Sequence, residues 1–176
     1  IFARPPIAID LAPCGRPGVI GGANHLRICA EYPRALVAAL GDPSTARDAL
    51  LFALLRALAD QIVAPHPDGD RPTRNEWERD AAAAMLARMF GREDAVTDLL
   101  DSLAERPEVQ AGLDLPGPSR ARMLRTAMTR PEGLREAEAD LLAAMSDAVI
   151  AQLLRAPPAW ADPALLGMER SRRALR

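Results

Sequence analysis

The chain has 176 residues, a formal net charge of -2, and a composition of 49% hydrophobic and 26% charged residues, which is ordinary for a globular protein. This length suits a single domain over residues 1–176 that buries its own core. The near-neutral charge argues against nucleic-acid binding. No apolar run approaches the roughly eighteen residues that a membrane-spanning helix needs, so we expect no transmembrane segment. The basic residues are all Arg, a bias typical of a GC-rich bacterial genome.

Residues 1–32 predict a small β-hairpin region. The apolar run at residues 7–11 is typical of a strand, and the alternation over residues 25–32 predicts a second, half-buried strand. A loop rich in Gly and Pro separates them. If the two strands pair as a hairpin, Cys14 and Cys29 come within bridging distance. A disulfide is then expected in an exported protein, and two buried thiols are the alternative.

Residues 33–156 predict a helical core, and residues 157–176 a C-terminal tail whose basic segment, residues 170–176, is expected to be solvated and frayed. Apolar content and spacing, together with Pro, Ser and Gly boundary signals, predict helices over residues 33–40, 44–63, 75–90, 92–105, 120–129 and 134–154. Ser44 is the expected N-cap of the second helix. Residues 49–59 of that helix are apolar except for Arg56, so the helix belongs in the middle of the fold. The fold class is therefore α+β and mainly α-helical.

Two of these helices resemble the site of a zinc peptidase. Residues 52–60 read Phe-Ala-Leu-Leu-Arg-Ala-Leu-Ala-Asp, and residues 75–81 read Asn-Glu-Trp-Glu-Arg-Asp-Ala. The second segment is similar to the later helix of gluzincin-type metallopeptidases, with Glu76 at the metal-ligand position and Asp80 one turn further on. The first segment resembles the family's His-Glu-Leu-Gly-His-Ala-Leu-Ile-Asp at Leu54, Ala57, Leu58 and Asp60.

The order of the preceding segments adds to this resemblance. Cys14, a loop rich in Gly and Asn, and a strand ending Ile-Cys-Ala-Glu-Tyr come before the first of the two helices, as in secreted members of that family. The resemblance covers residues 14–90 and implies a zincin-like core. If the resemblance holds, the helices predicted over residues 44–63 and 75–90 must cross so that residues 52, 56 and 76 converge.

The residues that would carry the chemistry are absent. Phe52 and Arg56 stand where the two histidine ligands would be, and Ala53 stands where the general base would be. The resemblance therefore implies a pseudoenzyme with no metal, no cofactor and no catalytic residue. Its vestigial positions are Phe52, Ala53, Arg56, Asp60, Glu76 and Asp80.

Arg56 has two candidate partners. A buried, bidentate ion pair with Glu76 would replace the metal as a link between the two helices. Alternatively, Arg56 reaches solvent and pairs with Asp60 at i,i+4. In that case the charged residues 76–80 are only the first turns of an exposed helix.

The resemblance predicts a binding or scaffolding module for an unidentified protein partner, exported to the periplasm or secreted, and cytoplasmic otherwise. Two other functions fit the sequence. One is a plain helical adaptor domain unrelated to peptidases. The other is a hydrolase that uses Cys14 or Cys29 as nucleophile with His25 as base, although no orienting third group is evident.

Overall fold

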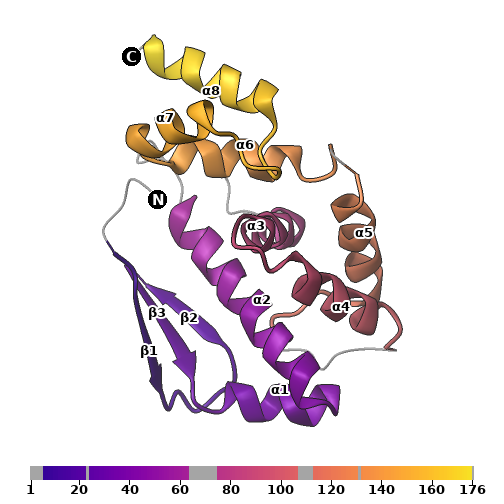
Figure 1. Cartoon of the computed structure of the whole chain (residues 1–176). Coiled ribbons are helices and arrows are strands. Elements are labelled where there is room, and N and C mark those ends of the chain that lie inside the picture. The colour runs from indigo at the N-terminus through magenta and orange to yellow at the C-terminus, as the bar shows by residue number, and fades with distance from the viewer. Residues whose placement is uncertain (1–5, 23, 64–74, 107–112, 131, 176) are drawn as a thin grey trace.

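The structure is a computed structural model, and it describes residues 6–22, 24–63, 75–106, 113–130 and 132–175. Figure 1 shows a small sheet on one side of the long helix α2, with the other helices on its opposite side and beyond its end. The predicted α+β, mainly α-helical class is confirmed. The described strands and helices are β1 (Ala8–Ala12), β2 (Val19–Gly22), β3 (His25–Cys29), α1 (Tyr32–Leu40), α2 (Pro43–Ile62), α3 (Glu76–Met89), α4 (Glu93–Ala104), α5 (Pro118–Met128), α6 (Arg135–Ala144), α7 (Asp147–Arg155) and α8 (Pro163–Ala174).

The sheet has the strand order β1-β3-β2. The predicted hairpin between the first and last strands is wrong, because β1 runs parallel to β3. The antiparallel partner of β3 is β2, which lies within the stretch predicted as a loop. A turn with Asn24 at a φ of 57° joins the two, in a left-handed conformation that Asn tolerates. Gly21 lets α2 approach β2 closely, since a Cβ there would lie 3.0 Å from Gln61 Nε2.

The predicted disulfide joins Cys14, just after β1, to Cys29 at the end of β3, with 5.3 Å between their Cα atoms. The parallel pairing of the two strands sets Ala12 opposite Cys29, which brings the two cysteines together. Glu31 closes the same loop by accepting hydrogen bonds from the backbone N–H groups of Cys14 and Gly15, at 3.2 and 3.1 Å. These contacts fix the sheet to the start of α1.

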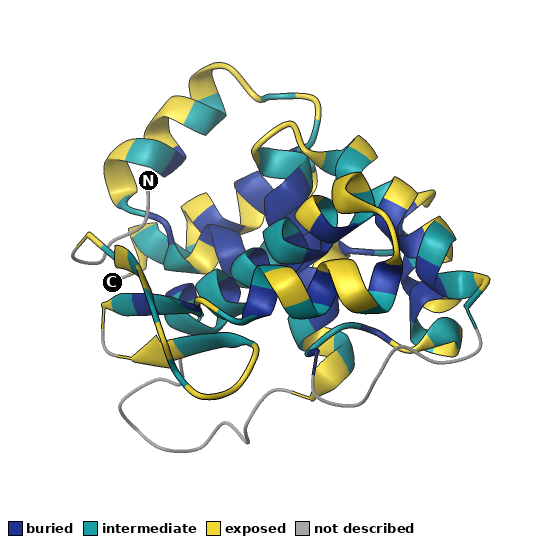
Figure 2. Ribbon diagram, turned by 90° about the horizontal axis from the view of Figure 1, so that it is seen from below, coloured by how far each residue is buried: buried dark blue, intermediate teal, exposed yellow. Residues whose placement is uncertain are grey.

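Helix α2 lies between the sheet and the helices α3 and α4 (Figure 1). Its N-cap is Asp42 and not the predicted Ser44: Asp42 Oδ2 accepts a hydrogen bond from Thr45 N at 2.7 Å, and the Ser44 hydroxyl donates to the same oxygen at 2.8 Å. The carboxylate one residue before Pro43 therefore caps the helix. Figure 2 shows that the buried positions gather in the central helices, while the strands are mostly intermediate or exposed.

Helix α3 packs directly on α2. It begins with a capping box, in which the Asn75 side chain accepts from Glu78 N at 2.9 Å and Glu78 reaches back to Asn75 N. Its run of four alanines, residues 81–84, is buried. Such small side chains permit the close approach of two helices, and this contact brings Arg56 of α2 to the start of α3.

The C-terminal part differs from the prediction in two ways. The single helix predicted over residues 134–154 is two, α6 and α7, because Met145 is extended and Ser146 caps a new helix by accepting from Val149 N. The predicted fraying of residues 170–176 is also wrong, since α8, capped by Asp162, continues to Ala174. Helix α8 buries Leu165 and Leu166 in a second hydrophobic cluster, smaller than the main core. Within the described residues, no helix is long and apolar enough to cross a membrane.

Candidate functional site

Arg56 is the centre of a buried charge cluster. Its side chain is 0% exposed, and its guanidinium contacts three carboxylates. Nη2 lies 2.6 Å from Glu76 Oε2, Nε lies 2.8 Å from Asp80 Oδ1, and Nη1 lies 2.6 Å from Asp114 Oδ1. Helix α2 thereby connects to α3 and to the chain before α5. We call Arg56, Asp60, Glu76, Arg79, Asp80, Asp114 and Arg120 the Arg56 cluster.

The expected ion pair between Arg56 and Glu76 is present, but its geometry differs from the prediction. Only one oxygen of Glu76 contacts Arg56, and the other accepts a hydrogen bond from Arg79 Nη1 at 3.0 Å. The alternative pairing of Arg56 with Asp60 is wrong, because Asp60 lies 2.8 Å from Arg79 Nη2 instead. Burial raises the pKa of Glu76, yet the hydrogen bonds from Arg56 and Arg79 outweigh it and hold that pKa below its usual value.

Asp80 is the most deeply buried carboxylate of the cluster, with 0% exposure. It lies 2.8 Å from Arg56 Nε and 3.0 Å from Arg120 Nε. Neither N–H group points along these directions, so among the described residues the Asp80 oxygens accept no aligned hydrogen bond. Burial raises the pKa of Asp80 to about 6, against the attraction of the two guanidinium groups.

The excess of carboxylates in the cluster adds to the effect of burial on the Asp80 pKa. It contains three guanidinium groups and four carboxylates, a net charge of -1 when all are ionised. Glu76 and Asp114 also face Asp80 and disfavour its charge. The carboxylate with the least access to water is the one that most readily takes up a proton.

Asp114 is the member that sequence analysis missed most clearly. It adopts a φ of 54°, and its backbone oxygen as well as its side chain accepts hydrogen bonds from Arg56 Nη1, at 2.5 and 2.6 Å. The buried Tyr32 hydroxyl donates to the neighbouring Leu113 oxygen at 2.5 Å. Arg79 and Arg120 were also not predicted. Nothing in the sequence near these residues links them to Arg56, although a Pro- and Gly-rich segment after Asp114 indicates a turn.

The remaining positions of the predicted vestigial site lie in the hydrophobic core. Phe52 and Ala53 are both fully buried on α2 and belong to the main cluster of apolar side chains. Phe52 lies one turn before Arg56 on the same helix. Arg56 and Glu76 therefore converge, with Asp80 beside them, whereas Asp60 joins the cluster through Arg79.

The other residues considered as catalytic or metal-binding candidates are held in structural contacts. Both cysteines are in the disulfide, so neither is a free thiol that could act as a nucleophile. His25 Nε2 lies 2.9 Å from Asp10, which also binds Arg27. Cys14, Cys29 and Glu31 are the one group of potential metal ligands brought together in the described part of the chain. The two sulfur atoms are bonded to each other, and the Glu31 carboxylate accepts hydrogen bonds from the backbone of Cys14 and Gly15. This group is therefore a structural clamp.

Comparisons with protein-family models, with curated proteins and with solved structures find no match for this chain. Its function is therefore inferred from the contacts of its own residues.

Proposed function

We propose that the chain is a non-catalytic relative of gluzincin-type metallopeptidases that serves as a binding or scaffolding module for a protein partner. One observation carries the proposal. The side chain at the second-histidine position, Arg56, is fully buried and contacts Glu76, at the later ligand position, and Asp80 one turn beyond it. A fixed cation thus lies among carboxylates at the positions that the resemblance aligns with the metal ligands of those peptidases.

The chemistry of Arg56 explains why such a protein would have no zinc. A guanidinium has no lone pair to offer a metal and stays protonated at any ordinary pH. In this proposal it also places a positive charge at the position assigned to the zinc ion, next to Glu76, the carboxylate assigned as its ligand. Phe52 offers no ligand atom either. The cluster in this proposal keeps the helices α2 and α3 together and performs no catalysis.

The disulfide between Cys14 and Cys29 supports an exported location for this module. Disulfides persist in oxidising compartments such as the periplasm and the extracellular space, and they are rare in the cytosol. Export would also fit a role in binding other proteins at the cell surface.

The first test is the metal content of the purified protein after equilibration with zinc and desalting. We expect no stoichiometric zinc in the wild-type chain. Stoichiometric zinc that disappears in Glu76→Ala would contradict the proposal, because the chain would then retain a complete set of ligands, at positions other than those that the resemblance assigns.

A sharper test restores the two missing ligands. In Phe52→His/Arg56→His the two imidazoles stand one turn apart on α2, with the one at position 56 beside Glu76, and the proposal predicts about one zinc ion per chain and a raised unfolding temperature. Adding Glu76→Ala should abolish this binding. The matched control is Leu54→His/Leu58→His, which has the same spacing on another face of α2.

The same experiment decides between this proposal and a helical adaptor unrelated to peptidases. If the restored variant is folded by circular dichroism and binds no zinc, or binds no more than the control, the relationship to metallopeptidases is wrong. The adaptor hypothesis then stands, since it does not require residues 52, 56 and 76 to derive from a metal-binding site.

A further inference from the structure

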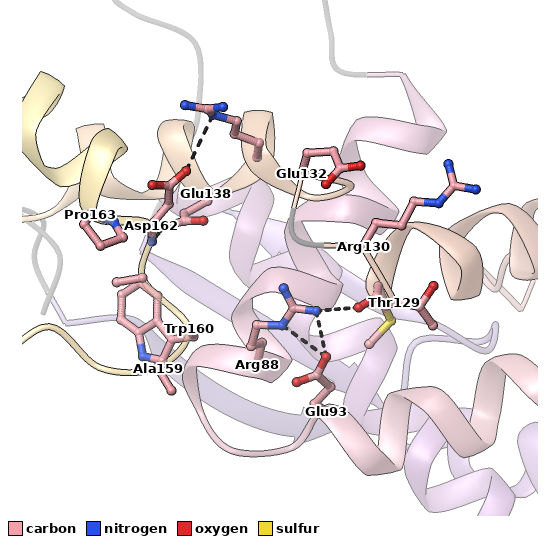
Figure 3. A pocket seen from close by; sticks show the side chains of 13 residues that line it. Arg88, Glu93, Thr129, Arg130, Glu132, Glu138, Ala159, Trp160, Asp162 and Pro163 are labelled. Carbon is pink, nitrogen blue, oxygen red and sulfur yellow. Dashed lines mark hydrogen bonds and ion pairs between the residues drawn. The ribbon is translucent and has the colours of Figure 1, made fainter.

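A cavity of about 840 Å³ lies where the end of α3, the starts of α4 and α6 and the loop before α8 meet. Figure 3 shows the side chains that line it, with Trp160, Glu138 and Asp162 on one side and Arg88, Glu93 and Thr129 on the other. Its volume is in the range of small-ligand sites. The cavity shares no residue with the Arg56 cluster, so a ligand bound in it is independent of the proposed function.

Glu138 is a buried carboxylate on the wall of this cavity. It is 5% exposed, and its Oε1 accepts a hydrogen bond from the backbone N–H of Asp162 at 2.5 Å. Within the described residues no Arg or His nitrogen forms an ion pair with it, and burial raises its pKa. A buried carboxylate is normally compensated by a cation in direct contact, whereas Arg88 and Arg135 attract Glu138 only from beyond ion-pair distance.

Two of the three guanidinium groups that line the cavity pair with carboxylates other than Glu138, and the third, Arg130, forms no ion pair with a described residue. Arg88 Nη2 lies 2.7 Å from Glu93 Oε1 and donates to the Met128 oxygen at 2.7 Å. Arg135 Nε lies 3.7 Å from Asp162 Oδ2. The lining contains four carboxylates and three guanidinium groups, so the cavity as a whole also carries an excess negative charge.

Trp160 supplies the apolar surface beside this carboxylate. Its side chain is half-buried, packs against both hydrophobic clusters, and lines the cavity with Met128 and Pro163. The face of an indole attracts cations, and its area suits an alkyl chain. An anionic ligand would meet Glu138 with the same charge, and a neutral one would leave Glu138 unpaired.

We propose that this cavity binds a primary ammonium group on an alkyl chain, as found in a free diamine or in the side chain of a lysine. The ammonium would donate to the Glu138 carboxylate, and the alkyl chain would lie on Trp160 and Met128. The ammonium carries three N–H groups, so it can donate to Glu138 and to Asp162 at the same time.

The competing explanation is that Glu138 only holds the loop before α8 through Asp162 N. Glu138→Gln separates the two roles, because the amide oxygen keeps the acceptor for Asp162 N and the charge is lost. Glu105→Gln is the matched control: it removes one carboxylate from the exposed end of α4, away from the cavity.

The experiment is a titration of the full chain with pentylamine, followed by the indole Nε1–H resonance of Trp160 in NMR spectra. Trp160→Phe assigns that resonance, since the chain has only two tryptophans. Pentanoate and pentanol serve as ligands of the same length without the positive charge. We expect pentylamine alone to shift the resonance, with affinity about tenfold weaker or worse in Glu138→Gln and unchanged in Glu105→Gln.

Two results would overturn the site. One is that pentanol or pentanoate binds as well as pentylamine, and the other is that Glu138→Gln keeps the wild-type affinity while folded. If Glu138→Gln does not fold, Trp160→Leu replaces it as the test variant. We expect its affinity for pentylamine to be about threefold weaker, because the indole face is missing. Unchanged affinity in Trp160→Leu would then overturn the proposal.

Two further titrations identify the source of the ammonium group, and either supports the site. Stronger binding of 1,5-diaminopentane than of a lysine-containing peptide with blocked ends would indicate a free diamine. Stronger binding of the peptide would indicate the lysine of a partner polypeptide.

Discussion

Arg56 is the residue on which the buried charges of this protein depend. In Arg56→Met, the fully buried Asp80 keeps Arg120 as its one ion-pair partner among the described residues, so we expect the free energy of unfolding to fall by about 3–5 kcal/mol. Glu76 is about half exposed, and solvent screens its pairing, so Glu76→Gln should cost about 1 kcal/mol or less. Urea denaturation measures both.

The double variant Arg56→Met/Asp80→Asn serves as the check, because it removes the buried anion together with its cation. It should be clearly more stable than the sum of the two single losses predicts. Strict additivity would show that the two side chains are not coupled.

Asp80 should also give the protein a distinctive dependence on pH. Its pKa is about 6 in the folded chain, against about 4 in the unfolded one. Between these values the folded state holds a proton that the unfolded state has released, so stability falls as pH rises from about 4 to about 6 and is constant above. The loss is at most about 3 kcal/mol.

The measurement compares the free energy of unfolding of wild type and Asp80→Asn at several pH values across this range. The difference between the two proteins isolates Asp80 from the carboxylates whose pKa is lowered. If the two pH profiles run parallel, the Asp80 carboxyl is not protonated in the folded protein.

The charge cluster could be predicted from the sequence only in part. A single Arg in an otherwise apolar helix needs a buried partner, and the resemblance to metallopeptidases pointed to Glu76. Asp114 and Arg120 could not be found in this way, because they come from segments whose approach to α2 depends on tertiary packing. The geometry at Glu76 was also beyond prediction, since it depends on Arg79 taking the second oxygen.

At the scale of secondary structure, the start of α2 offers a direct comparison of the predicted and observed caps. Asp42 accepts hydrogen bonds from Thr45 N, Thr45 Oγ1 and Ser44 Oγ, and they lower the pKa of Asp42 to about 2. Asp42→Ala should therefore lower the unfolding temperature, while Ser44→Ala should change it little. Asp42→Asn keeps a side-chain acceptor, so its unfolding temperature should lie between those of the wild type and Asp42→Ala. A larger effect of Ser44→Ala would favour the predicted cap.

Long apolar helices were easier to predict than the short elements between them. The long apolar run of α2, the small-residue stripe of α3 and the apolar periodicity of α4 extend over several turns, and they located these three helices closely. Strand β2 has only four residues, two of them Gly, and no local signal distinguishes it from a loop. The break at Met145 was missed for a similar reason: the apolar stripe continues across it, and only the Ser146 cap indicates a new helix.

For the whole molecule, the two hydrophobic clusters predict unequal local stability. The larger cluster contains side chains from all the helices α1 through α6 and from part of the sheet. The smaller one holds α7 and α8 against α6. Met89 and Trp160 pack against both. Fewer buried apolar side chains mean a smaller free energy for local opening.

We therefore expect the amides of α7 and α8 to exchange with deuterium well before those of α2 and α3, under conditions where the chain stays folded. Arg173 opposes this opening, because it donates to the Leu142 and Met145 oxygens and pairs with Glu169 and Asp147. Arg173→Leu should accelerate exchange in α7 and α8 and leave α2 unchanged. Equal protection of all four helices would mean that the small cluster opens only when the whole molecule unfolds. The cavity at Glu138 lies against the segment that leads into α8, so an ammonium ligand bound there should slow the exchange of α8 in particular.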